Sequence, residues 1–229
     1  MNSWRVEARH IPSAVMRMGY HRITLARISG LRFWKLLGTG RGQTFTLNDA
    51  DSRHWALLTV WDSLEQAREF QNSSLVLSWN RITSESGHVV MQPISSHGEW
   101  SGRSLFESDP QRVTEDAPIA VITRARIKPR MWRTFYRAVE PVATDLVNRT
   151  EVPIRFGIGE APIGLQGTFS IWRNAQAIRN FAYESPAHKQ AIKQTQTLQW
   201  YSEELFARFS IIEARGSINN TSLASIVKS

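Results

Sequence analysis

The chain has 229 residues, of which 41% are hydrophobic and none is cysteine, and its formal net charge is +8. The absence of cysteine excludes disulfides, Cys-ligated iron–sulfur clusters, Cys-zinc sites and thiolate-ligated haem. A bound metal would therefore need histidine, carboxylate, tyrosine or methionine ligands. The basic residues are dispersed and form no recognised nucleic-acid-binding motif, so we expect no nucleic-acid partner.

The N-terminal segment, about 3–26, is predicted to be a helix, and no strand is predicted before it. Charged residues are scattered through this segment, which lacks the apolar h-region of a signal peptide. No stretch of the chain approaches the roughly 20 apolar residues that a membrane-spanning helix needs. The sequence therefore predicts a cytoplasmic protein whose first unit begins at a helix.

The glycine-rich stretch "FWKLLGTGRG" (33–42) resembles a phosphate-binding loop in composition only. A P-loop places its lysine after the last glycine, whereas Lys35 precedes the glycines here. A dinucleotide-binding loop opens a helix, whereas the residues that follow here are typical of a turn. We interpret the stretch as a strand that ends in a glycine-rich turn.

An internal repeat follows. The segment "HWALLTVWDSLEQAREF" (54–70) resembles "QGTFSIWRNAQAIRNF" (166–181), and Trp61 aligns with Trp172 at an offset of 111 residues (172 − 61). Each copy is a short apolar run that ends in tryptophan and is followed by the start of a helix. Such self-similarity indicates that one structural unit occurs twice.

The repeat extends upstream into the glycine-rich stretch. "LLGTG" (36–40) matches "RFGIG" (155–159) at an offset of 119 residues (155 − 36). The first copy therefore has about eight extra residues (119 − 111) in the turn that follows. Two copies in one chain favour an architectural role for these glycines over a dedicated phosphate site.

The second copy shows the full order of elements. Its apolar patterns and helix-start signals predict, in chain order, strand 118–127, helix 130–149, strand 154–159, strand 167–172, helix 174–182, helix 185–200 and strand 204–214. The order β-α-β-β-α-β is that of the ferredoxin-like fold. We predict an α+β protein made of two tandem ferredoxin-like units, packed as a pseudo-dimeric α+β barrel whose first unit lacks its first strand.

The predicted domain organisation follows from the repeat. The first, N-terminally incomplete half spans 1–105, a polar linker spans 106–117, and the second half spans 118–215. The polar tail, 216–229, is expected to be loose.

Seven segments, spread in order over nearly the whole chain, resemble the spheroidene monooxygenase family. They are "GLRFWKLLGTGRGQTF" (30–45), "WALLTVWDS" (55–63), "GEWSG" (98–102), "FGIGEAP" (156–162), "TFSIW" (168–172), "SPAHKQAI" (185–192) and "EELFARF" (203–209). The family is similar to the dimeric α+β-barrel monooxygenases, and its members begin with a strand, which this chain is predicted to lack.

The resemblance implies the oxygenation of an acyclic carotenoid, with a keto group placed near the end of the polyene and haem as the cofactor. The implied partners are the carotenoid, O2 and an electron donor. Peripheral contact with the inner face of a membrane and oligomerisation are compatible with it. Two other functions stay open: a haem-binding or haem-degrading protein of the same fold, and a small-ligand binding module without catalysis.

His188 is the predicted ligand of the haem iron. It lies about three residues into the helix at 185–200, with Ala191, Ile192 and Thr195 on a small, largely apolar face that could accept a flat macrocycle. The positive end of the helix dipole disfavours imidazolium, and neutral imidazole is the ligating form. The resemblance points the same way, because the matching helix of haem-binding relatives supplies the proximal histidine.

Four further residues are assigned to cofactor binding. Trp172 and Phe181 are candidates for an aromatic wall, although core packing is the commoner role of such residues. Arg155 and Arg173 flank the sheet of the second half and could each pair with a haem propionate, because the guanidinium group suits carboxylates.

An alternative iron site uses His88, His97 and Glu99. His97 and Glu99 are two residues apart, so in a strand their side chains lie on one face. With His88 they could form a two-histidine, one-carboxylate iron site.

Overall fold

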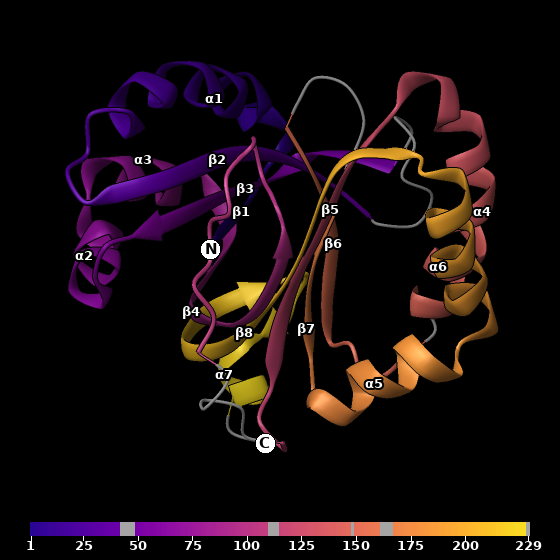
Figure 1. Ribbon diagram of the computed structural model, residues 1–229. Helices are drawn as coiled ribbons and strands as arrows, with labels where there is room; N and C mark the ends of the chain where they lie inside the picture. Colours follow the sequence, from indigo (N-terminus) through magenta and orange to yellow (C-terminus); the bar gives the residue numbers. More distant parts are fainter. Residues whose placement is uncertain (42–48, 110–114, 148, 161–166, 228–229) are drawn as a thin grey trace.

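The computed structural model of the protein describes residues 1–41, 49–109, 115–147, 149–160 and 167–227. Within these ranges, the side chains at positions 147, 184, 187, 188, 192 and 196 are not described. The protein is a mixed α+β structure in which one large antiparallel sheet is flanked by helices on two sides (Figure 1). Among the described residues, no helix combines the length and the apolar character needed to cross a membrane.

The strands are β1 (Asn2–Val6), β2 (Leu31–Gly40), β3 (Ala50–Trp61), β4 (Thr83–Gly98), β5 (Ile119–Ile127), β6 (Ile154–Gly159), β7 (Gly167–Trp172), β8 (Tyr201–Ile218) and β9 (Thr221–Ser222). The α-helices are α1 (Ile11–Leu25), α2 (Leu64–Glu69), α3 (Ser74–Asn80), α4 (Trp132–Val147), α5 (Ala175–Glu184), α6 (Pro186–Leu198) and α7 (Leu223–Val227). Short 3-10 helices are η1 (Ala8–His10), η3 (Phe70–Asn72) and η5 (Pro129–Met131).

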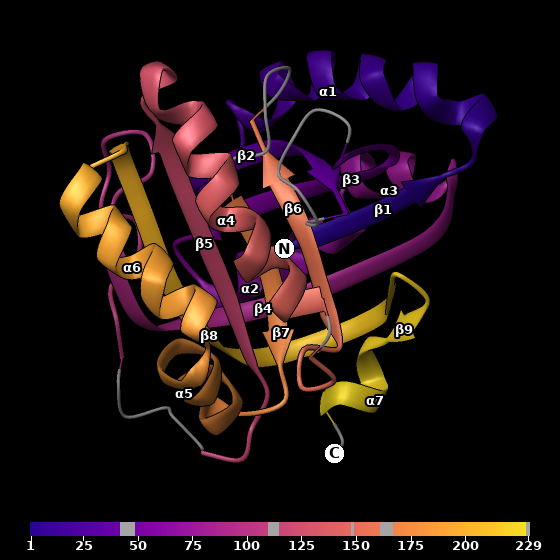
Figure 2. The ribbon, with the colours of Figure 1, turned by 90° about the vertical axis from the view of Figure 1, so that its right-hand side faces the viewer.

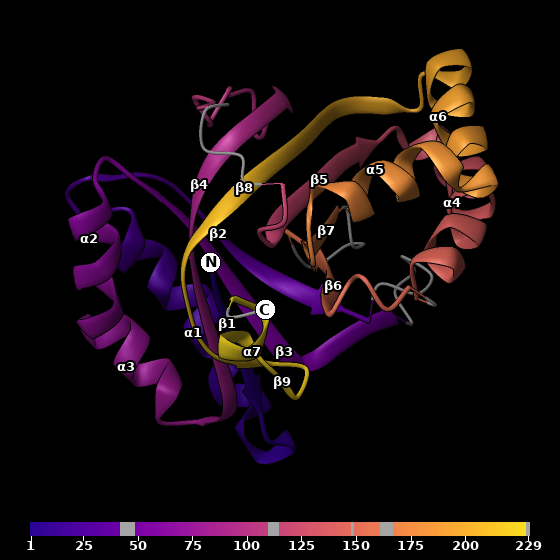
Figure 3. The same ribbon diagram turned by 90° about the horizontal axis from the view of Figure 1, so that it is seen from below.

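The sheet closes on itself. Its strand order is β4-β1-β3-β2-β6-β7-β5-β8-β9, and β4 also pairs with β8. Counted away from the β4–β8 pair, the two halves have the same strand order. It is β4-β1-β3-β2 in the first half and β8-β5-β7-β6 in the second. Seen from below, α1, α2 and α3 cover the sheet on one side and α4, α5 and α6 cover it on the other (Figure 3).

Alternation along the strands separates the interior of the closed sheet from its helix-covered outside. In β3, Ala56 and Leu58 belong to the interior cluster, whereas Leu57 between them packs under the helices of the first half. The same rule holds in β5, where Ala120 and Ile122 point inside and Val121 faces the helices. The fold thus has an apolar centre inside the sheet and separate apolar layers beneath the two groups of helices.

The two glycine-rich segments meet each other. At the junction of the halves, Gly38 pairs with Gly159 and Gly40 with Gly157, in the antiparallel ladder between β2 and β6. The interpretation of the stretch as a strand end is therefore confirmed for its described part. The longer turn of the first copy falls largely on 42–48, outside the described residues.

The predicted absence of a first strand is wrong. β1 lies between β3 and β4, and the first half contains four paired strands, so its N-terminal edge is not free. The sequence "NSWRV" is short and mostly polar, and it pairs because both of its faces are covered. Trp4 and Val6 pack under the helices, while Ser3 lies buried on the other face. The helix predicted over 3–26 begins only at Ile11.

Two segments expected to be polar surface are partly buried. At the linker start, Phe106 lies in the interior cluster, with its ring 4.9 Å from that of Phe209. The tail forms β9 and α7, and Leu223 and Ile226 pack into the same cluster. The tail is therefore not loose over 221–227, because α7 covers one end of the interior (Figure 2).

Candidate functional site

An apolar cavity of about 430 Å³ lies in the second half, between the sheet and its helices. Its floor is the helix-facing side of β5 and β8, including Ala125, Ile127 and Phe206. The long hydrophobic side of α4 forms one wall, where Phe135, Val139, Val142, Ala143 and Leu146 recur at helical spacing. Its volume is within the range of pockets for small molecules and cofactors.

Helix α6, which packs beside α4, forms a second wall. Its residues Ala191 and Thr195 line the cavity one turn apart. Beyond the end of the helix, fully buried Trp200 donates a hydrogen bond from Nε1 to Thr195 Oγ1 at 3.1 Å, and Phe135 meets the Trp200 ring edge-on at 5.5 Å. These contacts tie α6 to α4, so the wall has a defined position.

Position 188 lies in the first turn of this helix. α6 begins at Pro186, after Ser185, as the sequence predicts. The helical repeat places position 188 on the face that carries Ala191 and Thr195, three and seven residues later. The side chain of His188 itself lies outside the described part of the structure.

The helix layer of the first half has an aromatic centre, and its opening of about 470 Å³ is lined mostly by polar side chains such as Arg68, Gln71 and His88. Trp4 and Trp79 stack there with ring centroids 4.9 Å apart, and Trp79 Nε1 donates to His21 Nδ1 at 3.1 Å. Burial, helped by the charge of Arg17, lowers the pKa of His21 to about 4, so its ring is neutral and can accept this bond. The openings of the two halves therefore differ in character, mostly polar in the first and mostly apolar in the second.

Of the four other residues predicted to bind the cofactor, two lie at or behind the cavity wall and two lie away from the cavity. Phe181 lines the cavity, and Trp172 lies behind it at a ring distance of 5.3 Å, with its Nε1 donating to Ser170 Oγ. Arg155 and Arg173 do not line the cavity. Burial lowers the pKa of Arg155, while Arg173 is exposed and donates from Nε to the carbonyl of Thr150.

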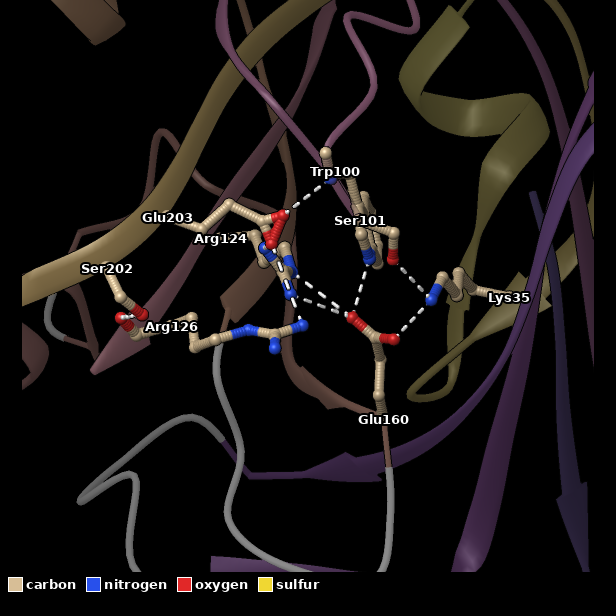
Figure 4. Close-up of polar contacts among 9 residues, drawn as sticks. Lys35, Trp100, Ser101, Arg124, Arg126, Glu160, Ser202 and Glu203 are labelled. Atoms are coloured by element: carbon tan, nitrogen blue, oxygen red, sulfur yellow. Dashed lines mark hydrogen bonds and ion pairs between the residues drawn. The ribbon is translucent and has the colours of Figure 1, made fainter. Parts of the chain in front are cut away.

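A buried ion-pair network adjoins the cavity (Figure 4). At its centre, Arg124 is 2% exposed and lines the cavity as well. It donates from Nη2 to Glu160 Oε1 at 3.0 Å and from Nη1 to Glu203 Oε2 at 2.7 Å. Glu160 also accepts hydrogen bonds from Lys35 and from Trp100 Nε1, and the Arg124 guanidinium lies over the Trp100 ring at 5.3 Å.

Both carboxylates in this network are held ionised. Burial by itself would raise the pKa of Glu160, but hydrogen bonds from Lys35 and Trp100 and the nearby charges outweigh it and lower that pKa. The pKa of Glu203 is lowered in the same way, because the bonds from Arg124 and the Gly102 amide outweigh burial. Each carboxylate is committed to a cation, so the network closes one end of the sheet interior and offers no free acid or base.

The alternative iron site is wrong. His88 and His97 lie nine residues apart on β4, which corresponds to roughly 30 Å along a strand. In the ladder between β4 and β8, His88 pairs with Arg215 and His97 pairs with Phe206. The side chain of His97 lies at the rim of the cavity, is 81% exposed, and has its Nε2 3.8 Å from Glu204 Oε1. Among the described residues, no group of three or more histidine, aspartate and glutamate side chains could hold a metal ion.

Sequence reasoning missed Arg124 and its two carboxylates. The alternation of side chains along β5 could have revealed Arg124, because it lies two and four residues after Ile122 and Ala120, on the same inward face. A charged residue on an apolar face needs a buried partner. Its partners could not be identified, because Glu160 and Glu203 lie 36 and 79 residues further along the chain.

Known proteins resemble this chain in sequence and in fold, although no family model matches it. A spheroidene monooxygenase of Cereibacter sphaeroides is 36% identical over 205 residues, which are 87% of this chain but only 60% of that protein. A spheroidene monooxygenase of Rhodobacter capsulatus is 31% identical over 211 residues, 90% of this chain and 86% of that protein. The structure of an aldoxime dehydratase in complex with butyraldoxime shares the fold, with a TM-score of 0.62 at 8% identity over all of this chain and 84% of that one. The chain belongs to the spheroidene monooxygenase family.

Proposed function

We propose that this protein is a monooxygenase that introduces a keto group into an acyclic carotenoid. The names of the relatives support the reaction and the substrate class. The structural observation that carries the proposal is the apolar cavity of about 430 Å³ between β5, β8, α4 and α6. Its hydrocarbon and aromatic walls suit an apolar ligand.

The fold is proposed to be a tandem arrangement of two ferredoxin-like units that form a pseudo-dimeric barrel. The equal strand orders of the two halves and the closing β4–β8 pair support this assignment. The proposed units remain 1–105 and 118–215, joined by 106–117. With this duplication, the two helix layers have diverged. The first has the Trp4–Trp79 stack and a mostly polar opening, and the second has the apolar cavity.

Haem is the proposed cofactor, and the residues of the cavity fit it. Phe135, Val139 and Phe181 provide apolar surface for a flat macrocycle, and the small side chain of Ala191 leaves room beside α6. His188 is the proposed axial ligand on that helix. Haem iron, when bound, would supply the one-electron centre that activates O2. Arg155 and Arg173 stay predictions for contacts with the propionates.

The chemistry sets what else must be supplied. Converting a methylene to a ketone adds one oxygen atom and removes two hydrogens. Two successive hydroxylations at one carbon, followed by loss of water, balance this change, and each consumes one O2, two electrons and two protons. The protein therefore needs an external electron donor. Because the polyene dissolves in lipid, contact with a membrane surface is part of the proposal.

The test is expression in a host that accumulates an acyclic carotenoid. The expected result is a carotenoid that has gained one oxygen and lost two hydrogens, with its absorption shifted to the red by the conjugated ketone. A purified protein with a Soret band but an unchanged pigment would favour a haem-binding or haem-degrading function. A protein that produces neither would favour a binding module.

A further inference from the structure

Helix α1 has apolar residues on two opposite faces. Its inner face packs into the first half through Ala14, Leu25 and neighbouring residues. Its outer face carries Met16, Tyr20 and Ile23, spaced four and three residues apart and exposed by 70%, 48% and 61%. Residues at this spacing form one stripe along a helix, and here the stripe lies opposite the core.

The first helix of the second half provides a comparison within the same chain. Among the described side chains of α4, the exposed ones are polar with the exception of Pro141: Arg133, Thr134, Arg137, Glu140 and Thr144. A solvent-facing helix surface is expected to have this composition. The apolar outer stripe is therefore particular to α1 and is not a general feature of helices on this sheet.

The charge around the stripe has one sign. Residues 8–41 contain seven Lys and Arg but no Asp or Glu. Arg22 and Arg27 are exposed beside the stripe, and neither forms an ion pair within the described part of the chain. An exposed apolar stripe flanked by unpaired arginines is the pattern of helices that lie in the interface of an anionic membrane.

We propose that α1 docks this protein on an anionic lipid bilayer, with Met16, Tyr20 and Ile23 inserted between the headgroups and Arg22 and Arg27 contacting lipid phosphates. The helix forms an outer edge of the molecule and has nothing beyond it in either of two perpendicular views (Figures 1 and 2). The choice of lipid rests on the proposed function, because a carotenoid substrate resides in the bilayer. Vesicle binding itself requires neither haem nor turnover.

The test is co-sedimentation of the full chain with vesicles of phosphatidylcholine alone or mixed with phosphatidylglycerol. The wild type should bind the mixed vesicles and bind phosphatidylcholine weakly. The double variant Met16→Gln/Ile23→Gln should partition at least ~10-fold more weakly, because binding scales with the apolar area inserted. Arg22→Gln/Arg27→Gln should also bind more weakly and show less dependence on salt.

The matched control is Leu77→Gln/Tyr183→Gln, which removes two exposed apolar side chains from α3 and α5. It should bind like the wild type, and thermal melts should show that every variant is folded. Absence of vesicle binding would overturn the proposal, as would equal binding by the stripe variant. A third outcome would also overturn it: the wild type does not bind vesicles but self-associates with rising concentration, and the stripe variant does not. That result would make the outer face of α1 a contact between two copies of the chain. The Soret band of each purified variant and the pigment made by its expression host are measured separately. They show whether the proposed reaction fails independently of vesicle binding.

Discussion

Arg124 borders both the cavity and the interior of the closed sheet. It is almost fully buried, and its two carboxylate partners come from β8 and from the residue directly after β6. Removing one member of a buried pair leaves the others charged and unpaired, which is more costly than the pair itself is stabilising. This residue therefore allows a direct test of the network.

Arg124→Met is expected to lower the free energy of unfolding by ~3–5 kcal/mol at pH 7, as other broken buried pairs do. The matched control is Arg126→Met on the same strand, where Arg126 lies 3.7 Å from Glu203 but is 53% exposed. It should cost at most ~1 kcal/mol, the usual range for a surface pair. Urea unfolding of the three proteins measures both values, and equal losses would contradict the assigned role of Arg124.

The difference in stability between the wild type and Arg124→Met should depend on pH in a defined direction. The pKa values of Glu160 and Glu203 are lowered in the folded protein, so their contribution is complete above the ordinary glutamate pKa of 4.5. It is lost as the pH falls through the lower folded values. The gap in stability between wild type and Arg124→Met should therefore narrow below about pH 4.5 and stay constant from pH 6 to 8.

At the scale of elements, α3 closes the helix layer of the first half. Trp79 on α3 is fully buried against Trp4 and bonded to His21. Trp79→Ala should destabilise the protein by ~3–5 kcal/mol, because it removes a large buried aromatic and leaves a cavity. Leu77→Ala on the same helix, where Leu77 is 45% exposed, should change stability by less than ~0.5 kcal/mol. Thermal and urea unfolding give the comparison, and a small loss for Trp79→Ala would show that the layer is not held by this stack.

The elements differ in how well sequence predicted them. β6 and β7 have the predicted bounds, because each is an apolar segment bounded by turn signals. The start of α5 also has a local cause, because Asn174 caps the helix and its Oδ1 accepts from the Ala177 amide at 2.9 Å. β1 was missed, because a five-residue polar strand has no periodic signal and is defined by its neighbours β3 and β4.

The candidate site was predictable only in part for a related reason. The start of α6 and the place of position 188 on it follow from local signals. The cavity needs Phe135, Phe181 and Tyr201 to converge from three elements, and the ion-pair network joins residues up to 125 positions apart. Such contacts are created by the closed sheet and cannot be read from local patterns.

At the scale of the whole molecule, two halves with one strand order have different helix layers. The first has the Trp4–Trp79 stack and an opening lined mostly by polar side chains, whereas the second has an apolar cavity of about 430 Å³ beside α6. An apolar cavity with a few polar groups at its edge is the expected form of a site for a small molecule or cofactor. The central claim is that this cavity holds haem on His188.

Haemin titration of the purified protein, followed at the Soret band, tests that claim most directly. The wild type should bind with a saturable Soret shift, and His188→Ala should bind at least ~10-fold more weakly, a loss of ~1.4 kcal/mol or more. His97→Ala is the control, because His97 lies at the rim and is largely exposed. It should titrate like the wild type. A normal Soret band in His188→Ala would contradict the account, and its loss in His97→Ala instead would move the iron to the rim of the cavity.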